Sequence, residues 1–303
     1  MEFQELDSRS LVNRLSGTGM PFGWTVNPFR GCELGCRYCY ARPTHEYLGH
    51  SRPEEFEDRI YVKRSDPARL VADLKRARDS GQEVAIGAAT DPYQPAESRF
   101  QVTRGVLEAI FKVPGLRVGI TTKSPAVTRD LELLRSIAAR TELHVNVSVI
   151  SMDADLVRLI EPRASRPDLR LSAVRALAEA GVSTRVFVMP VLPLITDGDA
   201  NLRAVLGAAR AAGAREAICN ALFLRTPMVW AFFLRFIEEE FPWAVARYRE
   251  LYPRPGSAPR AYREAIEQRV EGIAREVGFP VRSREERVRA EAPPRSPQLS
   301  LVW

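Results

Sequence analysis

The chain has 303 residues, of which 45% are hydrophobic and 27% charged, a composition that excludes disordered, collagen-like and disulfide-scaffolded proteins. Its 44 basic and 38 acidic residues give a net charge of +6. No apolar segment approaches the roughly 20 residues that a membrane-spanning helix needs, and the acidic N-terminus lacks the basic and apolar regions of a signal peptide. We therefore expect a cytoplasmic protein with no membrane partner.

Short apolar runs alternate with amphipathic segments along most of the chain. The first 20 residues show no regular pattern and are expected to form an irregular arm, followed by a short strand at residues 24–27. Later strands are rich in Val, Ile and Ala, as is typical of strands covered on both faces, and are predicted at residues 84–89, 117–121, 143–150, 184–189 and 217–224. Helices are predicted at residues 67–79, 103–112, 126–140, 167–179 and 200–211.

This alternation predicts an α/β fold built from parallel βα units. Because the units end near residue 225, a partial (β/α)6 barrel of the TIM type fits better than a full (β/α)8 barrel. We expect an arm over residues 1–20, a core domain over 21–225 and a helical C-terminal extension over 226–303. Residues 292–298 of that extension have the composition of a disordered tail. Functional residues of such folds gather where strands end and loops begin.

Three of the four cysteines, Cys32, Cys36 and Cys39, follow a C-x3-C-x2-C spacing. In a cytoplasmic chain, clustered thiols indicate metal ligands more than disulfides. Three thiolates on one loop can hold three corners of a [4Fe–4S] cluster, and the fourth iron then stays open because such clusters normally take four thiolates. A structural zinc site also needs four ligands. The candidates for a fourth ligand are scattered along the chain: His45, His50, His144 and Cys219.

The segment that carries these three cysteines resembles the signature of the radical S-adenosylmethionine (SAM) superfamily. The wider sequence pattern is similar to the spore photoproduct lyase-like branch of that superfamily. The resemblance covers about residues 20–225 and rests on residues 31–42, 90–95, 121–123, 147–148, 161–163 and 170–171. It implies a radical SAM partial barrel that binds a [4Fe–4S] cluster and SAM. It also implies reductive cleavage of SAM to a 5′-deoxyadenosyl radical, which abstracts hydrogen from a pyrimidine lesion in DNA. A flavodoxin- or ferredoxin-type electron donor would be the protein partner.

The resemblance also assigns roles to single residues. Cys32, Cys36 and Cys39 would be the cluster ligands, Thr90 would contact SAM through its hydroxyl, and Lys123 would pair with the SAM carboxylate. Ser148 would lie near the SAM carboxylate or ribose, although a serine bonded to local backbone explains its position equally well. Tyr38 would lie near SAM, and both Tyr38 and Tyr40 would help to return hydrogen to a product radical; aromatic packing of the loop is the alternative.

The loop after the second predicted barrel strand contributes further candidates. Asp91 is predicted to bind the cofactor or to face the substrate, together with Tyr93 and Gln94. Glu161 and Arg163 are predicted to form an ion pair that braces the site.

One position departs from the family pattern. Ala88 stands where spore photoproduct lyases carry a hydrogen-donor cysteine, so lesion reversal through that relay is in doubt. Cys219 is the one spare thiol, and it is either an inert buried cysteine or a radical relay.

Three functions remain open from the sequence. The first is a radical SAM enzyme acting on DNA lesions, which the net charge of +4 over residues 247–303 supports weakly. The second is a radical SAM enzyme that modifies a peptide or a small metabolite, which Ala88 favours. The third is a non-catalytic, zinc-stabilised nucleic-acid-binding protein.

Overall fold

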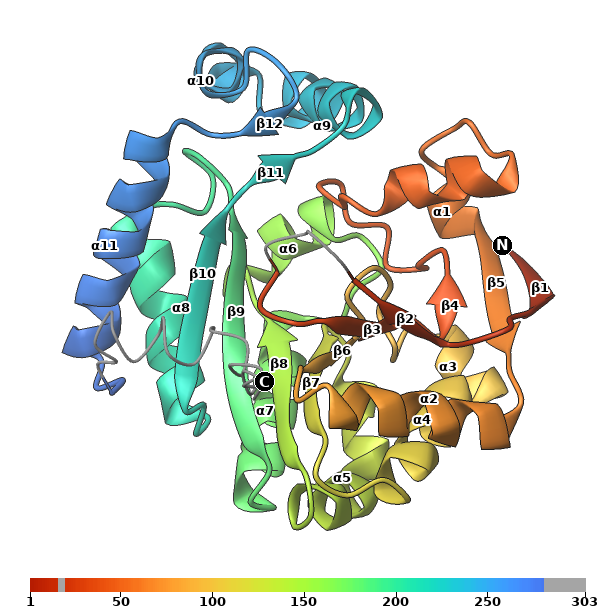
Figure 1. The fold of residues 1–303 in the computed structure, drawn as a ribbon. Coiled ribbons are helices and arrows are strands. Elements are labelled where there is room, and N and C mark those ends of the chain that lie inside the picture. The colour runs from red at the N-terminus through yellow and green to blue at the C-terminus, as the bar shows by residue number, and fades with distance from the viewer. Residues whose placement is uncertain (16–19, 281–303) are drawn as a thin grey trace, which may run out of the picture.

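The centre of the molecule is an open sheet of six parallel strands, seen in a computed structural model that describes residues 1–15 and 20–280 (Figure 1). The parallel strands are β3 (Trp24–Val26), β6 (Val84–Ile86), β7 (Arg117–Thr122), β8 (Glu142–Ser148), β9 (Ser183–Val191) and β10 (Glu216–Ala221). They neighbour one another in chain order, and β2 (Val12–Arg14) adds an antiparallel strand beside β3. Since β2 and β10 do not pair, the sheet stays open, and the predicted partial barrel is confirmed.

Helices connect successive parallel strands, as the βα rhythm predicts. They are α2 (Pro67–Asp79), α4 (Val102–Phe111), η2 (Pro125–Asp130) with α5 (Leu131–Ala138), α6 (Ala154–Ile160) with α7 (Pro167–Glu179), and α8 (Asp199–Ala211). Both α2 and α7 begin with proline at the first helical turn, and the Asp66 side chain caps α2 by accepting from the Arg69 amide at 2.7 Å. Their apolar faces and the sheet form one large buried core.

The N-terminal arm contains regular strands, so the prediction of an irregular arm is wrong for its described residues. The first strand, β1 (Glu2–Asp7), pairs in parallel with β5 (Arg59–Arg64), which also pairs with β4 (Phe29–Arg30). Most β1 side chains are exposed. The apolar alternation that marks a strand in sequence is therefore absent there. This second sheet, with the short elements η1 (Arg42–Leu48), α1 (Glu55–Asp58) and α3 (Ala96–Phe100), surrounds the cysteine loop.

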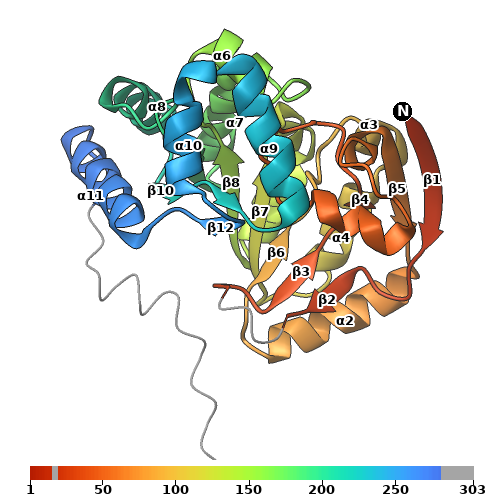
Figure 2. The ribbon, with the colours of Figure 1, turned by 90° about the horizontal axis from the view of Figure 1, so that it is seen from above.

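The C-terminal segment is mainly helical over its described residues, with one short strand pair, and packs against the barrel. It comprises β11 (Phe223–Leu224), α9 (Pro227–Glu240), η3 (Pro242–Ala244), α10 (Val245–Leu251), β12 (Gly256–Ser257) and α11 (Arg260–Glu276). Helices α9 and α10 lie side by side at the end of the barrel where β9 and β10 terminate (Figures 1 and 2). Helix α11 packs on α8 and β10 and adds Ile266, Val270 and Ile273 to the main core. The predicted disordered tail lies outside the described residues.

None of the helices in residues 1–15 and 20–280 combines the length and the apolar character that crossing a membrane requires.

Candidate active site

The three clustered cysteines lie on one tight loop, residues 31–40, which we call the cysteine loop. Two glycines let this loop lie against its support. Gly31 has φ +82°, and a Cβ there would lie 2.5 Å from the Arg59 carbonyl oxygen; Gly35 has φ +67°, and a Cβ there would lie 2.2 Å from Glu57 Oε2. The Cys32 amide donates to the Phe56 carbonyl at 2.8 Å. The loop is therefore fixed on α1 and β5 before any ligand binds.

A buried arginine supports the middle of the cysteine loop. Arg42 donates to the carbonyl oxygens of Cys36 at 3.0 Å and of Pro53 at 2.7 Å. Its charge is balanced by Glu57 at 3.3 Å, and its guanidinium lies 4.2 Å from the centre of the Phe232 ring in α9. Sequence reasoning missed both Arg42 and Glu57, because their role depends on contacts between distant segments.

The cysteine thiols suit a metal cluster. Cys32 and Cys36 are buried and Cys39 is partly exposed, and none of the three forms a disulfide. Burial raises the pKa of Cys32 well above its ordinary value and the pKa of Cys36 to about 12. Both thiols therefore stay protonated unless a metal charge stabilises the thiolate.

The arrangement of the donor side chains bears on which metal group the loop could hold. Within residues 1–15 and 20–280, no three His, Cys, Asp or Glu side chains converge to hold one metal ion. A [4Fe–4S] cluster has no such requirement, since each thiolate binds a different iron. The candidate zinc ligands are engaged elsewhere: His45 bonds to the Arg59 carbonyl, His50 to the Tyr61 hydroxyl, and His144 lies beside Glu83.

Lys123 directly follows β7 and brings a cation to the cysteine loop. Its Nζ lies 5.7 Å from the centre of the Tyr38 ring and, within the described chain, has no hydrogen-bond or ion-pair partner. Burial alone would lower its pKa, but the Glu161 carboxylate, together with Cys36 in its thiolate form, outweighs burial and raises the pKa of Lys123 above its ordinary value. Lys123 is thus a permanent cation with free donors beside the thiols.

The predicted hydroxyl positions follow β6 and β8, the two strands on either side of β7. Ser148 is the last residue of β8 and is buried. Thr90 follows β6, is also buried, and donates its hydroxyl hydrogen to the Phe29 carbonyl at 3.2 Å. Because that hydrogen is already used, the Thr90 oxygen is left as an acceptor for a ligand.

The carboxylate of Asp91 faces the protein interior. It accepts from the Thr122 hydroxyl at 2.7 Å, the Lys123 amide at 2.7 Å and the Tyr93 amide at 2.9 Å. Tyr93 is buried and donates to Asp130 at 3.1 Å, while the buried Gln94 bonds to the cysteine loop. The prediction that Tyr93 and Gln94 face the substrate is wrong, because both side chains are used to join loops.

Glu161 and Arg170 form the buried centre of the site. Both side chains are fully buried and lie 2.5 Å apart, Glu161 accepts from the Tyr38 hydroxyl, and Arg170 donates to the Ser148 carbonyl at 3.0 Å. Burial alone would raise the pKa of Glu161, but Arg170 and Lys123 hold it below its ordinary value. The predicted pair of Glu161 with Arg163 is wrong, since Arg163 pairs with Glu57 at 2.7 Å.

Tyr40 lies at the mouth of the site. Its ring is partly exposed, and its hydroxyl donates to the carbonyl oxygen of Ala88. Burial of the hydroxyl and the neighbouring Cys39 raise the pKa of Tyr40 to about 12, against the opposing charge of Arg225. Tyr40 is therefore a neutral phenol at physiological pH.

Cys219 is on β10 and packs against the main core, whereas Cys32, Cys36 and Cys39 belong to a second core with α9.

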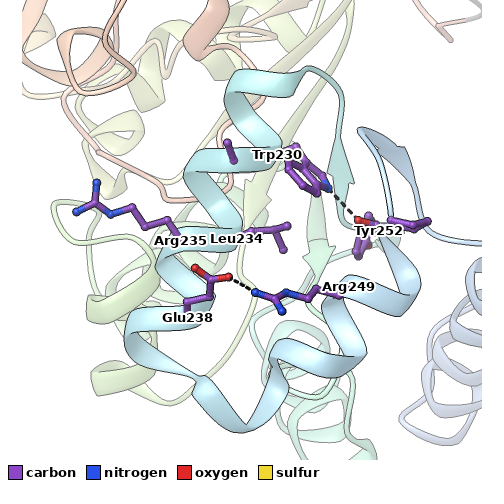
Figure 3. A pocket seen from close by; sticks show the side chains of 8 residues that line it. Trp230, Leu234, Arg235, Glu238, Arg249 and Tyr252 are labelled. Atoms are coloured by element: carbon purple, nitrogen blue, oxygen red, sulfur yellow. Dashed lines mark hydrogen bonds and ion pairs between the residues drawn. The ribbon is translucent and has the colours of Figure 1, made fainter.

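A separate cavity of about 530 Å³ lies between α9 and α10 (Figure 3). In its wall, Arg249 pairs with Glu238 at 2.8 Å, and the Trp230 indole donates to the Tyr252 carbonyl at 2.8 Å. None of the predicted site residues lines this cavity.

The sequence matches the profile of the Radical SAM superfamily over residues 26–204. The chain is 37% identical to uncharacterized protein Rv2578c of Mycobacterium tuberculosis, over 88% of this chain and 78% of that protein. It is 27% identical to uncharacterized protein MJ0683 of Methanocaldococcus jannaschii, over 57% and 62% of the two chains.

Two solved structures resemble the fold. A spore photoproduct lyase complexed with dinucleoside spore photoproduct matches with a TM-score of 0.69 and 15% identity, over 91% of this chain and 79% of that one. Streptococcus suis SuiB bound to precursor peptide SuiA matches with a TM-score of 0.50 and 16% identity, over 74% and 46%. At these identities the structures show a shared fold only. The profile match, which spans more than half of the chain, shows that this chain belongs to the radical SAM superfamily.

Proposed function

We propose that this chain is a radical SAM enzyme that cleaves SAM reductively and abstracts hydrogen from a pyrimidine lesion in DNA. The observation that carries the proposal is the position of Lys123, whose ammonium lies over the Tyr38 ring of the cysteine loop and has no hydrogen-bond or ion-pair partner among the described residues. A cation there suits the carboxylate of an amino-acid ligand that also binds the metal cluster.

Each site residue has a distinct task in this proposal. Cys32, Cys36 and Cys39 would hold the [4Fe–4S] cluster, Lys123 would bind the SAM carboxylate, and Thr90 would accept a hydrogen bond from SAM. When bound, the cluster supplies the electron that splits SAM into methionine and a 5′-deoxyadenosyl radical. A cytoplasmic location would keep the thiols reduced, and a flavodoxin- or ferredoxin-type protein would deliver the electron.

Tyr40 is the best candidate to return hydrogen to the product radical. Its hydroxyl contacts Ala88, the position of the donor cysteine in the spore photoproduct lyase-like pattern, whereas the Tyr38 hydroxyl is bound to Glu161. The tyrosyl radical left on Tyr40 would take a hydrogen atom from 5′-deoxyadenosine, or an electron from the protein donor together with a proton from solvent.

The mouth of the site carries features that suit nucleic acid. Arg225 is exposed, has no acidic partner in the described residues, and lies close enough to Tyr40 to affect its pKa. The Phe223 side chain, two residues earlier, is 44% exposed. A cation and an aromatic ring together suit a phosphate and an adjacent base.

A second candidate keeps the chemistry but changes the substrate to a peptide or small metabolite. Ala88 favours it, because the thiol hydrogen donor expected of a lesion-reversing lyase is missing. The fold likeness to SuiB, whose structure contains a precursor peptide, is compatible with this candidate.

Lesion turnover separates the two candidates. The reconstituted protein is incubated anaerobically with SAM, dithionite and dinucleoside spore photoproduct, and the thymidine released by reversal is measured by mass spectrometry. We expect product from the native chain, and Tyr40→Phe should lower product while SAM cleavage continues. If SAM is cleaved but the lesion is untouched, and DNA fails to bind even at low ionic strength, the DNA proposal is overturned and the second candidate is favoured.

A further inference from the structure

The loop after β6, residues 90–96, is bonded to the backbone on both sides of Cys32. The Gln94 side chain accepts from the Glu33 amide at 2.9 Å and donates to the Gly31 carbonyl at 3.2 Å. The Ala96 amide donates to the Glu33 carboxylate at 2.5 Å. These bonds hold the loop and Cys32 at a fixed separation.

Asp91 projects from this loop toward the end of β7. Its carboxylate accepts three hydrogen bonds, from Thr122, from the Lys123 amide and from the Tyr93 amide, at 2.7 to 2.9 Å. Three donors stabilise the ionised form of a buried carboxyl group. Burial raises the pKa of Asp91 above its ordinary value, whereas these three bonds favour the ionised form, which places a negative charge next to the backbone of Lys123.

The same charge acts on Cys32. The Asp91 carboxylate disfavours the Cys32 thiolate, whereas the Asp91 backbone N–H favours it. The carboxylate also favours the charged form of Lys123. The Asp91 backbone thus contacts the predicted cluster ligand Cys32, and its carboxylate accepts from the amide of the predicted SAM-binding residue Lys123.

We propose that Asp91 is a positioning residue that holds the reduction potential of the cluster low and fixes Lys123 for SAM binding. This inference rests on the proposed function. A negative charge beside a cluster disfavours the added electron, because net charge and hydrogen bonds to the sulfurs set the potentials of iron–sulfur clusters. The low potential would make the reduced cluster a stronger reductant toward SAM.

The test measures the cluster midpoint potential by EPR-monitored titration, without SAM. Asp91→Asn should shift the potential in the positive direction, because it removes the charge at nearly constant shape. Asp91→Glu retains the charge and should stay near the native value. Thr122→Val removes one hydrogen bond but leaves the carboxylate, and it should also leave the potential near the native value. Lys123→Met removes a positive charge and should shift it in the negative direction.

SAM affinity gives an independent readout. Asp91→Asn cannot offer acceptors to both the Lys123 and Tyr93 amides, so SAM should bind more weakly to it than to the Thr122→Val protein. Calorimetry on the oxidised, cluster-loaded proteins measures this without turnover.

Each outcome has one meaning. A D91N potential equal to the native value overturns the inference, as does a shift of equal size in Asp91→Glu. If D91N loads no cluster while Asp91→Glu loads normally, Asp91 is needed for assembly and the tuning role is also overturned. If the native protein itself takes up no iron and sulfide, the proposed function fails instead.

Discussion

The buried pair of Glu161 and Arg170 offers a quantitative test of how the site is held together. Glu161→Gln removes the charge that balances Arg170, although a side-chain oxygen remains for Tyr38. Both side chains are fully buried, and stranding one partner of a buried ion pair costs about 3–5 kcal/mol. With an unfolding entropy of roughly 2.1 cal/mol/K per residue, a loss of about 4 kcal/mol in this 303-residue chain lowers Tm by about 6 °C.

The assay is thermal and urea unfolding of the metal-free protein at pH 7, followed by circular dichroism. Glu161→Gln is compared with Arg170→Met and with the double variant, which should recover much of the loss because neither charge is then unpaired. Glu132→Gln, in the exposed pair with Arg135, is the matched control and should leave Tm unchanged. Full additivity of the two single variants would refute the reasoning.

The pair also predicts a pH dependence of stability. The pKa of Glu161 lies below its ordinary value of 4.5 in the folded protein. Its ionised form therefore stabilises the fold at pH values above 4.5, and this contribution is lost as the pH falls through the lower, folded-state pKa. The stability difference between native and Glu161→Gln proteins should shrink below pH 4.5. A difference that stays constant or grows on acidification contradicts the assignment.

Three further variants test other parts of the site. Gln94→Ala removes both hydrogen bonds that flank Cys32, so we expect lower iron and sulfide content after reconstitution; native-like cluster content would contradict this. Lys123→Met should weaken SAM binding about 10- to 100-fold, the loss expected for a charge-assisted hydrogen bond, whereas Lys112→Met, on an exposed helix end, should bind normally; equal affinities would remove the carboxylate role. Arg225→Ala should weaken DNA binding and reduce the salt slope by about one. Arg215 directly precedes the first residue of β10, at the end of that strand far from Arg225, so Arg215→Ala should change neither the DNA affinity nor the salt slope. Equal effects of Arg225→Ala and Arg215→Ala would argue for a diffuse charge effect.

The barrel could be predicted from sequence because its signals are local. Helices α2 and α7 begin at Pro67 and Pro167 and have the predicted bounds, and the buried strands are continuous apolar runs. The predicted helix at residues 126–140 begins instead as the 3-10 segment η2. Strand β1 escaped prediction because it is exposed and its partner, β5, lies more than 50 residues away. The division near residue 225 stays a prediction, although α11 shares the main core.

The side-chain partners within the site could not be predicted. Glu161 and Arg163 are neighbours in sequence, but Arg163 pairs with Glu57, which is 106 residues away, and Glu161 pairs with Arg170 across the start of α7. The Asp91 side chain likewise points inward because it accepts three hydrogen bonds, and two of their donors, Thr122 and Lys123, lie at the end of another strand, β7. The cysteine loop was predictable because the spacing of its three cysteines is by itself typical of a metal-binding loop.

Formation of 5′-deoxyadenosine tests the central claim most directly. The chain is reconstituted anaerobically with iron and sulfide, reduced with dithionite and mixed with SAM, and the nucleoside is quantified by mass spectrometry beside a Cys36→Ser control. We predict cluster-dependent 5′-deoxyadenosine from the native protein and none from the control. A native protein that carries about four irons yet releases no 5′-deoxyadenosine would contradict the account.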